Sequence, residues 1–309
     1  MTVQGYPEAR MRTLRRLALA ADLVALAAVV LGSWTRINGA GETCPDWPLC
    51  RGSIVPSLSD GTLWEWLHRL LAFALVPLIA ALVVSGWRQR KRSPFILPTL
   101  LAIAGIFLAQ LLLGAATVRL ANAPLSVVLH WGTAMALVAA LSAMTIFAGA
   151  AQRAPASADL RIVVYLTATL AFVTMCVGAY VSSSGAGLAC LSIPDCAGYV
   201  VVYSDGQIIQ LLHRFAAATT LVAAAGSLAL GWARPASPAV RAAVSVGAAL
   251  IGLQVLLGLL NVALRLPTDL REAHAVNAAL AFLAFVVASV FAALDAVTLK
   301  SSQTVTVNR

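Results

Sequence analysis

The sequence predicts an all-α integral membrane protein whose eight transmembrane helices form two tandem four-helix bundles. Three observations predict this fold class. The 309 residues are 61% hydrophobic and only 11% charged, whereas soluble domains carry about 25% charged residues. Continuous apolar runs of about 20 residues, long enough to cross a bilayer, recur along the whole chain. The second half of the chain also repeats motifs of the first half at a nearly constant offset.

The apolar runs are continuous and do not alternate with polar residues. This favours helices over a β-barrel, because a helix satisfies its own backbone hydrogen bonds in lipid. In chain order, the predicted spans are Leu14–Trp34, Leu67–Trp87, Phe95–Val118, Leu125–Ala150, Ile162–Val181, Ile208–Trp232, Val240–Leu264 and Ala273–Leu299.

The basic residues predict how these helices are oriented. One side of the predicted topology carries 14 of the 21 Lys and Arg residues: Arg10, Arg12, Arg15, Arg16, Arg88, Arg90, Lys91, Arg92, Arg153, Arg161, Arg234, Arg241, Lys300 and Arg309. The positive-inside rule places this side in the cytoplasm, together with both termini. The net charge of +9 is therefore a topology signal, and nucleic-acid binding is not expected.

An internal repeat relates the two halves. The segment GSWTRINGAGETCPDWPLC at Gly32–Cys50 resembles GAYVSSSGAGLACLSIPDC at Gly178–Cys196, and WLHR at Trp66–Arg69 resembles LLHR at Leu211–Arg214. Corresponding landmarks lie 144 to 146 residues apart. Each half has an even number of spans, so we expect a pseudo-twofold axis along the membrane normal. The predicted domains are residues 1–151 and 152–309.

All four histidines, His68, His130, His213 and His274, lie near the outer ends of the even-numbered predicted helices. A lone histidine in a span often only hydrogen-bonds a neighbouring helix, but polar groups in a membrane are costly and two duplicated pairs indicate function. Two imidazoles facing each other make an axial-ligand pair for haem iron. Zinc is less attractive, since no further ligand lies at metal-like spacing. Pairing His68 with His130 and His213 with His274 gives one haem-sized site per half, although the sequence does not distinguish this from pairing across halves.

The residues around the histidines suggest further roles. Arg69 and Arg214 each follow a histidine, and could bind haem propionates or only anchor a helix end at the interface. Two cysteine pairs, Cys44/Cys50 and Cys190/Cys196, lie in loops on the outer, oxidising side, so we expect one disulfide in each loop. The alternative is an exchangeable thiol pair, for which Cys44 and Cys50 are the better candidates.

The two halves differ at one carboxylate. Glu65 stands three residues before His68, whereas Gln210 stands three residues before His213. Residues three apart share a helix face, and a carboxylate can take or give a proton where an amide can only hydrogen-bond. We therefore expect the first half to be reactive and the second half to hold a permanent cofactor. Alternatively, Glu65 only marks a helix N-terminus, where a carboxylate is favourable.

These residues together resemble bacterial haem A synthase over essentially the whole chain: the E-x-x-H-R motif at Glu65–Arg69, the three further histidines and the paired loop cysteines. The resemblance implies a plasma-membrane oxidoreductase that converts the C8 methyl of haem O to a formyl group by successive hydroxylation and dehydration. It implies that His68 and His130 flank the substrate haem, that His213 and His274 ligate haem b, and that Glu65 is essential. Haem O synthase and haem-copper oxidase assembly factors are the implied partners, and a homo-oligomer is compatible with the resemblance.

Two other classes of membrane protein fit the sequence less well. A di-haem cytochrome b that only transfers electrons, similar to a quinol dehydrogenase, would need no acid–base residue, so Glu65 weighs against it. A transporter built on parallel repeats would favour broken helices and charges at mid-membrane, whereas the polar groups here gather at the outer helix ends.

Overall fold

The computed structural model describes residues 5–149, 156–193, 195–196 and 204–307, with side chains described between residues 8 and 294 of these ranges. The regular elements are all helical: α1 (Gly5–Ile37), α2 (Thr62–Gln89), α3 (Ile96–Arg119), α4 (Pro124–Phe147), α5 (Ala158–Ser183), the 3₁₀ turn η1 (Ala186–Leu188), α6 (Asp205–Ala233), α7 (Pro238–Ala263) and α8 (Thr268–Val307). The described residues contain no β-strand, only an isolated bridge between Cys50 and Ser53.

Each of the eight α-helices contains a stretch long and apolar enough to cross a membrane. This confirms the prediction of an all-α, multi-pass membrane protein. The helix ends were predicted less well, because polar residues at the membrane interface lower the local hydropathy while the helix continues. Thus α2 begins at Thr62 and not at Leu67, which places Glu65 in its first turn. The fourth span was predicted to reach Ala150, which lies outside the described residues, whereas α4 ends at Phe147.

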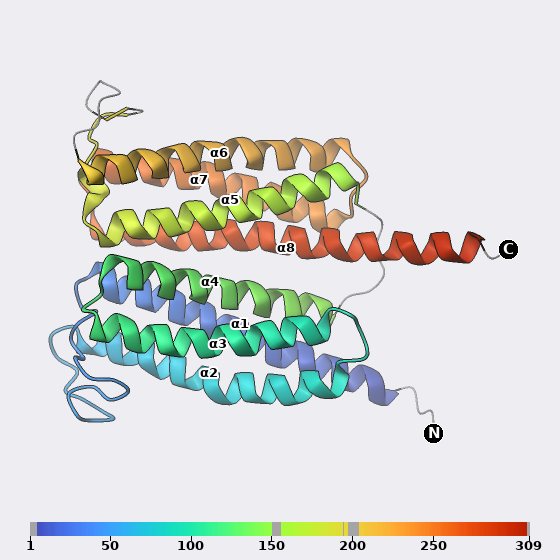
Figure 1. Cartoon of the computed structure of the whole chain (residues 1–309), viewed down its shortest axis with the longest axis horizontal. Coiled ribbons are helices and arrows are strands. Elements are labelled where there is room, and N and C mark those ends of the chain that lie inside the picture. The colour runs from blue at the N-terminus through green and yellow to red at the C-terminus, as the bar shows by residue number, and fades with distance from the viewer. Residues whose placement is uncertain (1–4, 150–155, 194, 197–203, 308–309) are drawn as a thin grey trace. The chain divides into compact units, whose positions relative to one another are not determined.

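The chain divides into two compact units, residues 1–149 (unit 1) and 150–309 (unit 2). The predicted domain boundary after residue 151 falls outside the described residues. In unit 1, α1 packs against α2 and α4, and α3 packs against α4 and α2 (Figure 1). In unit 2, α5 packs against α6 and α8, and α7 packs against α8 and α6. The helices of each unit are therefore neighbours in the same cyclic order.

Close packing holds each unit together, since lipid removes the hydrophobic driving force between helices. In unit 1, Leu14, Leu82 and Met144 are fully buried, whereas the side chain of Leu112 on α3 is 66% exposed. In unit 2, the fully buried Phe285 lies against Gly247, where a Cβ would come within 2.8 Å of the ring. Glycine at this position thus allows α7 to approach the aromatic ring of α8.

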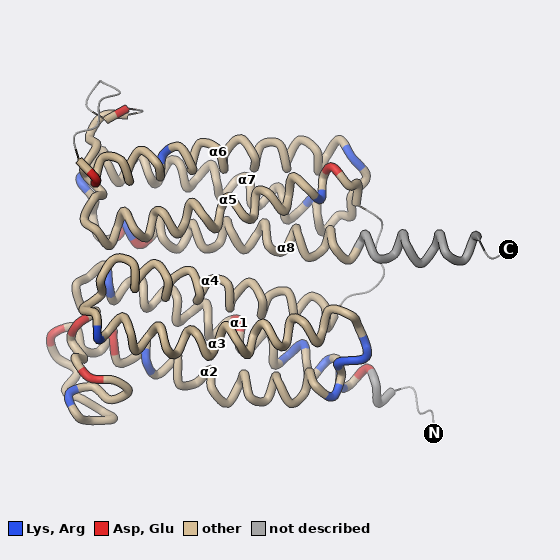
Figure 2. Tube along the Cα trace, viewed as in Figure 1, with Lys and Arg blue, Asp and Glu red and all other residues tan. Residues whose placement is uncertain are grey.

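Two basic clusters of unit 1, at residues 10–16 and 88–92, lie at the end of the unit opposite its long loop. Helix α1 runs from the arginines at 10–16 towards the loop 38–61, and α2 returns to the basic cluster at 88–92 (Figure 2). Arg153 and the side chains of Lys300 and Arg309 lie outside what the structure describes. Because α2 and α4 both begin at the loop end, His68 and His130 lie near that end of unit 1.

Truncating Phe285 tests the packing of unit 2. We expect Phe285→Ala to lower the free energy of unfolding by about 3 kcal/mol, because it opens a cavity against Gly247. Leu280→Ala is the matched control, since Leu280 lies on the same helix but is 40% exposed. Unfolding in detergent micelles, followed by circular dichroism, measures both. Equal destabilisation by the two variants would contradict this description of the core.

Candidate functional site

The structure brings His68 of α2 and His130 of α4 together inside unit 1. Their ring centroids are 6.5 Å apart and the ring planes are nearly perpendicular, at 82°. Nδ1 of His68 lies 2.9 Å from the carbonyl oxygen of Ala28 on α1. A Cβ on Gly32, one turn further along α1, would lie 2.7 Å from Cε1 of His68. The hydrogen bond and the close approach of α1 fix the position of the His68 ring.

Unit 2 arranges His213 and His274 similarly, except that Nδ1 of His213 has no hydrogen-bond partner among the described residues. A Cβ on Gly178 of α5 would lie 2.8 Å from Cε1 of His213. The carbonyl of Thr174, which corresponds to that of Ala28 in the repeat, lies beside His213. His213 and His274 are near enough to interact electrostatically. Each unit therefore brings its own two histidines together.

The donor set of each pair fits haem better than a zinc ion. Among the described residues, no group of three or more His, Cys, Asp or Glu side chains could hold a metal ion. Zinc needs three or four such ligands, whereas haem iron needs only axial ligands from the protein. A centroid separation of 6.5 Å accommodates one metal ion between two imidazoles, since a metal–nitrogen bond is about 2 Å long.

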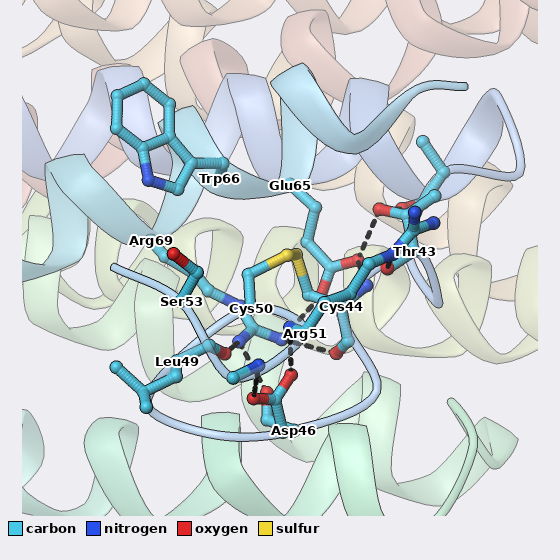
Figure 3. The surroundings of a disulfide bond; sticks show 12 residues. Thr43, Cys44, Asp46, Leu49, Cys50, Arg51, Ser53, Glu65, Trp66 and Arg69 are labelled. Atoms are coloured by element: carbon cyan, nitrogen blue, oxygen red, sulfur yellow. Dashed lines mark hydrogen bonds and ion pairs between the residues drawn. A yellow bond between two sulfur atoms is a disulfide. The ribbon is translucent and has the colours of Figure 1, made fainter. Parts of the chain in front are cut away.

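The predicted disulfides Cys44–Cys50 and Cys190–Cys196 are both formed. Figure 3 shows the first of them, with the sulfur–sulfur bond between the labelled Cys44 and Cys50. All four cysteines are at most 2% exposed. A thiol exchange at either disulfide would therefore require the loop to open first.

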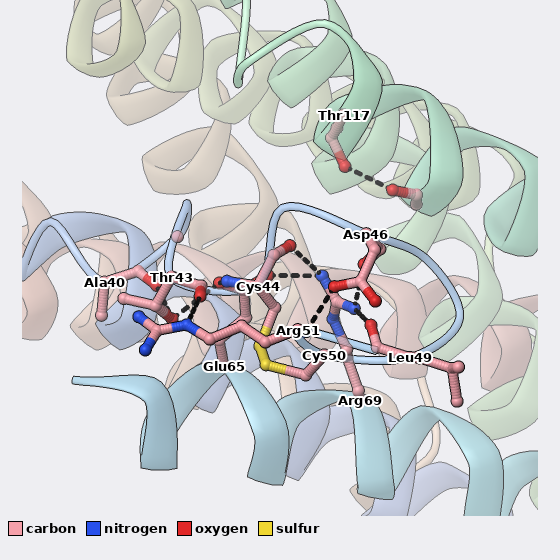
Figure 4. Close-up of polar contacts among 12 residues, drawn as sticks. Ala40, Thr43, Cys44, Asp46, Leu49, Cys50, Arg51, Glu65, Arg69 and Thr117 are labelled. Atoms are coloured by element: carbon pink, nitrogen blue, oxygen red, sulfur yellow. Dashed lines mark hydrogen bonds and ion pairs between the residues drawn. A yellow bond between two sulfur atoms is a disulfide. The ribbon is translucent and has the colours of Figure 1, made fainter. Parts of the chain in front are cut away.

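An arginine binds each disulfide loop to the helix below it. Nη1 of Arg69 donates to the carbonyl oxygens of Asp46 (2.6 Å) and Leu49, and Nη2 donates to that of Cys44 (2.7 Å) (Figure 4). Arg69 is only 8% exposed. These contacts give the guanidinium a structural function that we did not predict from the sequence.

Arg214 makes the corresponding contacts in unit 2. Its Nη1 donates to Ser192 (2.7 Å) and Asp195 (2.5 Å), and its Nη2 donates to Cys190 (2.8 Å), in each case to the carbonyl oxygen. These three acceptors correspond, at an offset of 146 residues, to those of Arg69. We call the contacts of each arginine with its three loop carbonyls a clamp. The repeated His-Arg dipeptide was the sequence signal that could have indicated this duplicated clamp.

Glu65 connects the same loop to the first turn of α2. Its Oε1 forms an ion pair with Nη2 of Arg69 at 2.7 Å. Its Oε2 accepts hydrogen bonds from the Thr43 hydroxyl (2.9 Å) and the Cys44 backbone N–H (3.0 Å). The residue is 5% exposed. Glu65 thus stabilises the loop in addition to standing one turn before His68 on α2.

Gln210 occupies the equivalent position in unit 2 but makes different contacts. Its Nε2 donates to the carbonyl of Gly187 at 3.1 Å, and its buried Oε1 has no hydrogen-bond partner among the described residues. An amide cannot form the ion pair that Glu65 forms with Arg69. The difference between the halves seen in the sequence is therefore also a difference in how the two loops are held.

The first loop also binds to itself through Asp46. The carboxylate accepts hydrogen bonds from the backbone N–H of Gly52 (2.7 Å) and of Arg51 (2.5 Å). These bonds, that of Gly52 above all, together with the charge of Arg69, lower the pKa of Asp46 below its usual value. This contribution to loop stability is present above the ordinary carboxyl pKa and is lost as the pH falls through the lowered one.

Several polar contacts near the histidines were missed from the sequence. Gln110 lies 3.4 Å from His130, measured between their Nε2 atoms, and Asn277 donates to Gln254 at 2.7 Å. The repeated pattern Q-x-L-L-G begins at Gln110 and at Gln254, but it does not indicate which residues their side chains contact. Glu272 is a further buried carboxylate, 9% exposed. It stands two residues before a histidine and so on a different face of the helix.

Comparison with known proteins places these features in a family. The family model COX15-CtaA, described as a cytochrome oxidase assembly protein, matches residues 15–61 and 57–286. A heme A synthase of Shouchella clausii is 32% identical over 66% of this chain and 71% of its own length. A heme A synthase of Symbiobacterium thermophilum is 30% identical over 69% and 73%, respectively, and one of Bacillus pumilus is 29% identical over 66% and 70%.

Replacing the clamp arginines tests their hold on the loops. We expect Arg69→Lys to accelerate reduction of Cys44–Cys50 by about tenfold, because a compact ammonium cannot reproduce the contacts that the two separate Nη atoms of arginine make, and hydrogen bonds of a charged donor are strong. Arg214→Lys is the matched variant and should accelerate only reduction of Cys190–Cys196. Timed phosphine reduction, alkylation and peptide mass spectrometry measure both rates. Unchanged rates at each variant's own disulfide would show that the arginines do not hold the loops closed.

Proposed function

The chain belongs to the COX15-CtaA family of cytochrome oxidase assembly proteins, and from this premise we infer that it is a haem A synthase, an oxidoreductase that converts haem O to haem A. The observation that carries the inference is the histidine pair inside unit 1, at 6.5 Å between ring centroids, in a chain whose relatives are named heme A synthases. Those names also weigh against a protein that only transfers electrons.

The two units have different functions in this proposal. His68 and His130 flank the substrate haem O in unit 1, and His213 and His274 ligate a haem b in unit 2. A haem b held by His213 and His274 would supply electron transfer, and the C8 methyl of haem O would be converted in unit 1 to a formyl group by successive hydroxylation and loss of water. The close approach of Gly32 to His68 and of Gly178 to His213 holds these imidazoles in place.

Glu65 is the acidic residue of the reaction. Converting a methyl group to an aldehyde replaces C–H bonds by C–O bonds and involves proton transfer, and a carboxylate close to the substrate can take or give a proton. The position of Glu65 one turn before His68, and its absence from unit 2, support this role. Its hydrogen bonds to Thr43 and Cys44 also connect the carboxylate with the loop, so a proton gained by Glu65 would weaken its hold on that loop.

Arg69 and Arg214 border the outer edge of the two sites. Their guanidinium groups bind loop carbonyls, so a haem propionate reaching either arginine would displace one of these acceptors. We therefore assign them a double role, in closing the loop and in receiving propionates. The loop cysteines contribute by keeping these carbonyls in place.

The membrane orientation completes the proposal. The basic clusters at 10–16 and 88–92 support cytoplasmic termini, which puts the histidine ends and the disulfide loops on the outer side of a bacterial plasma membrane. Haem O synthase would supply the substrate, and assembly factors of haem-copper oxidases would receive the product. Association of several copies in the membrane is compatible with this arrangement.

Glu65→Gln tests the acidic residue. We expect haem A formation to fall by at least about 100-fold, because the amide cannot accept a proton, while haem b bound to unit 2 stays at the wild-type level. Haem A is measured by chromatography of extracted haems from cells that supply haem O. Wild-type haem A formation in this variant would refute the assignment.

Thr43→Val is the control that separates the two roles of Glu65. It removes one hydrogen bond between Glu65 and the loop but keeps the carboxylate. We expect this variant to retain most of the activity. If it loses as much activity as Glu65→Gln, the function of Glu65 lies in holding the loop and not in proton transfer.

A further inference from the structure

Two glutamines at equivalent positions of the repeat have different partners. Gln110 of α3 places its Nε2 3.4 Å from Nε2 of His130, inside unit 1. In unit 2, Oε1 of Gln254 on α7 accepts a hydrogen bond from Nδ2 of Asn277 at 2.7 Å. Asn277 Nδ2 also donates to the carbonyl of Leu250 at 2.9 Å. Asn277 thus holds the side chain of Gln254. Among the described residues, the side-chain amide of Gln254 has no hydrogen bond to a histidine.

The difference follows from the residue that corresponds to Asn277 in unit 1. That residue is Thr133, 144 positions earlier. Its hydroxyl donates to the carbonyl of Leu129 in its own helix at 2.6 Å. Oε1 of Gln110 is buried and has no hydrogen-bond partner among the residues that the structure describes. A threonine therefore leaves the first glutamine free to turn its amide towards the histidine.

The contact occupies the nitrogen that matters for ligation. A neutral imidazole has a single nitrogen lone pair, which either accepts a hydrogen bond or binds a metal ion. When Nδ1 of His130 carries the proton, an amide N–H of Gln110 and an iron atom compete for the lone pair on Nε2. His274, whose equivalent glutamine is engaged by Asn277, faces no such competition.

We propose that Gln110 is a positioning residue that weakens haem binding by His130, and that Asn277 prevents Gln254 from doing the same to His274. The proposal rests on the proposed function and deepens it. A substrate site must release its product after each turnover, whereas a cofactor site must retain its haem. The pair Thr133/Asn277 sets this difference between two otherwise duplicated sites.

Haem release from the full-length protein tests the proposal without measuring catalysis. The purified protein in detergent is loaded with ferric haem b and mixed with excess apomyoglobin, and transfer is followed by absorbance. We expect a faster phase from unit 1 and a slower phase from unit 2. Thr133→Asn should slow the faster phase about fivefold, the size expected for one neutral hydrogen bond. Asn277→Thr should accelerate the slower phase by a similar factor.

Two further variants make the test independent of any single substitution. Gln110→Leu removes the competitor and should also slow the faster phase, whereas Thr133→Ser keeps only a hydroxyl and should change neither phase. Circular dichroism and haem stoichiometry check that each variant is folded. If folded Thr133→Asn and Gln110→Leu both leave the faster phase unchanged, the proposal is wrong.

A parallel assay separates this proposal from the proposed function. If wild-type protein forms haem A but its release phases do not respond to the variants, only the role of Gln110 is refuted. If wild-type protein forms no haem A in cells that supply haem O, the proposed function is refuted, and the release phases still decide whether Gln110 competes for His130.

Discussion

The bond between an arginine and the carbonyls of a disulfide loop is the interaction on which each half of this protein depends. A guanidinium near the end of a membrane-embedded helix must find acceptors, and carbonyls of a tightly closed loop must find donors. Arg69 and Arg214 meet both needs with three equivalent carbonyls each. The loops thereby lie at the ends of the units where α2 and α6, which carry His68 and His213, begin.

Differences between the duplicated units then assign their functions. Both units keep two histidines, to which we assign haem binding, and an arginine and a disulfide, which hold the loop. Unit 1 adds the carboxylate of Glu65, which both holds the loop and can exchange a proton. Unit 2 replaces it with Gln210 and adds Asn277, which holds Gln254 by a hydrogen bond. Under our proposal, the site of unit 1 carries out the chemistry and exchanges its haem, and the site of unit 2 retains its haem.

Much of the fold could be predicted from the sequence, because long apolar runs leave helices as the only structures that satisfy the backbone in lipid. The disulfides and the histidine candidates followed from the repeat and from the scarcity of polar residues. The start of α2 could not be predicted. Its first turn contains polar residues such as Glu65, so the apolar run begins several residues after the helix does. The clamp of Arg69 could not be predicted either, because its acceptors are backbone carbonyls, which any residue provides. The partner of Gln254 depends on which faces of α7 and α8 pack together, and this packing cannot be read from a single sequence.

The composition of the bound haems tests the central claim most directly. The protein is purified from cells that also make haem O, and its haems are extracted, separated by chromatography and quantified per chain. Our account predicts haem b together with haem O or haem A, because one unit retains a cofactor and the other binds substrate or product. Two equivalents of haem b per chain, with no conversion of haem O in the same cells, would contradict it.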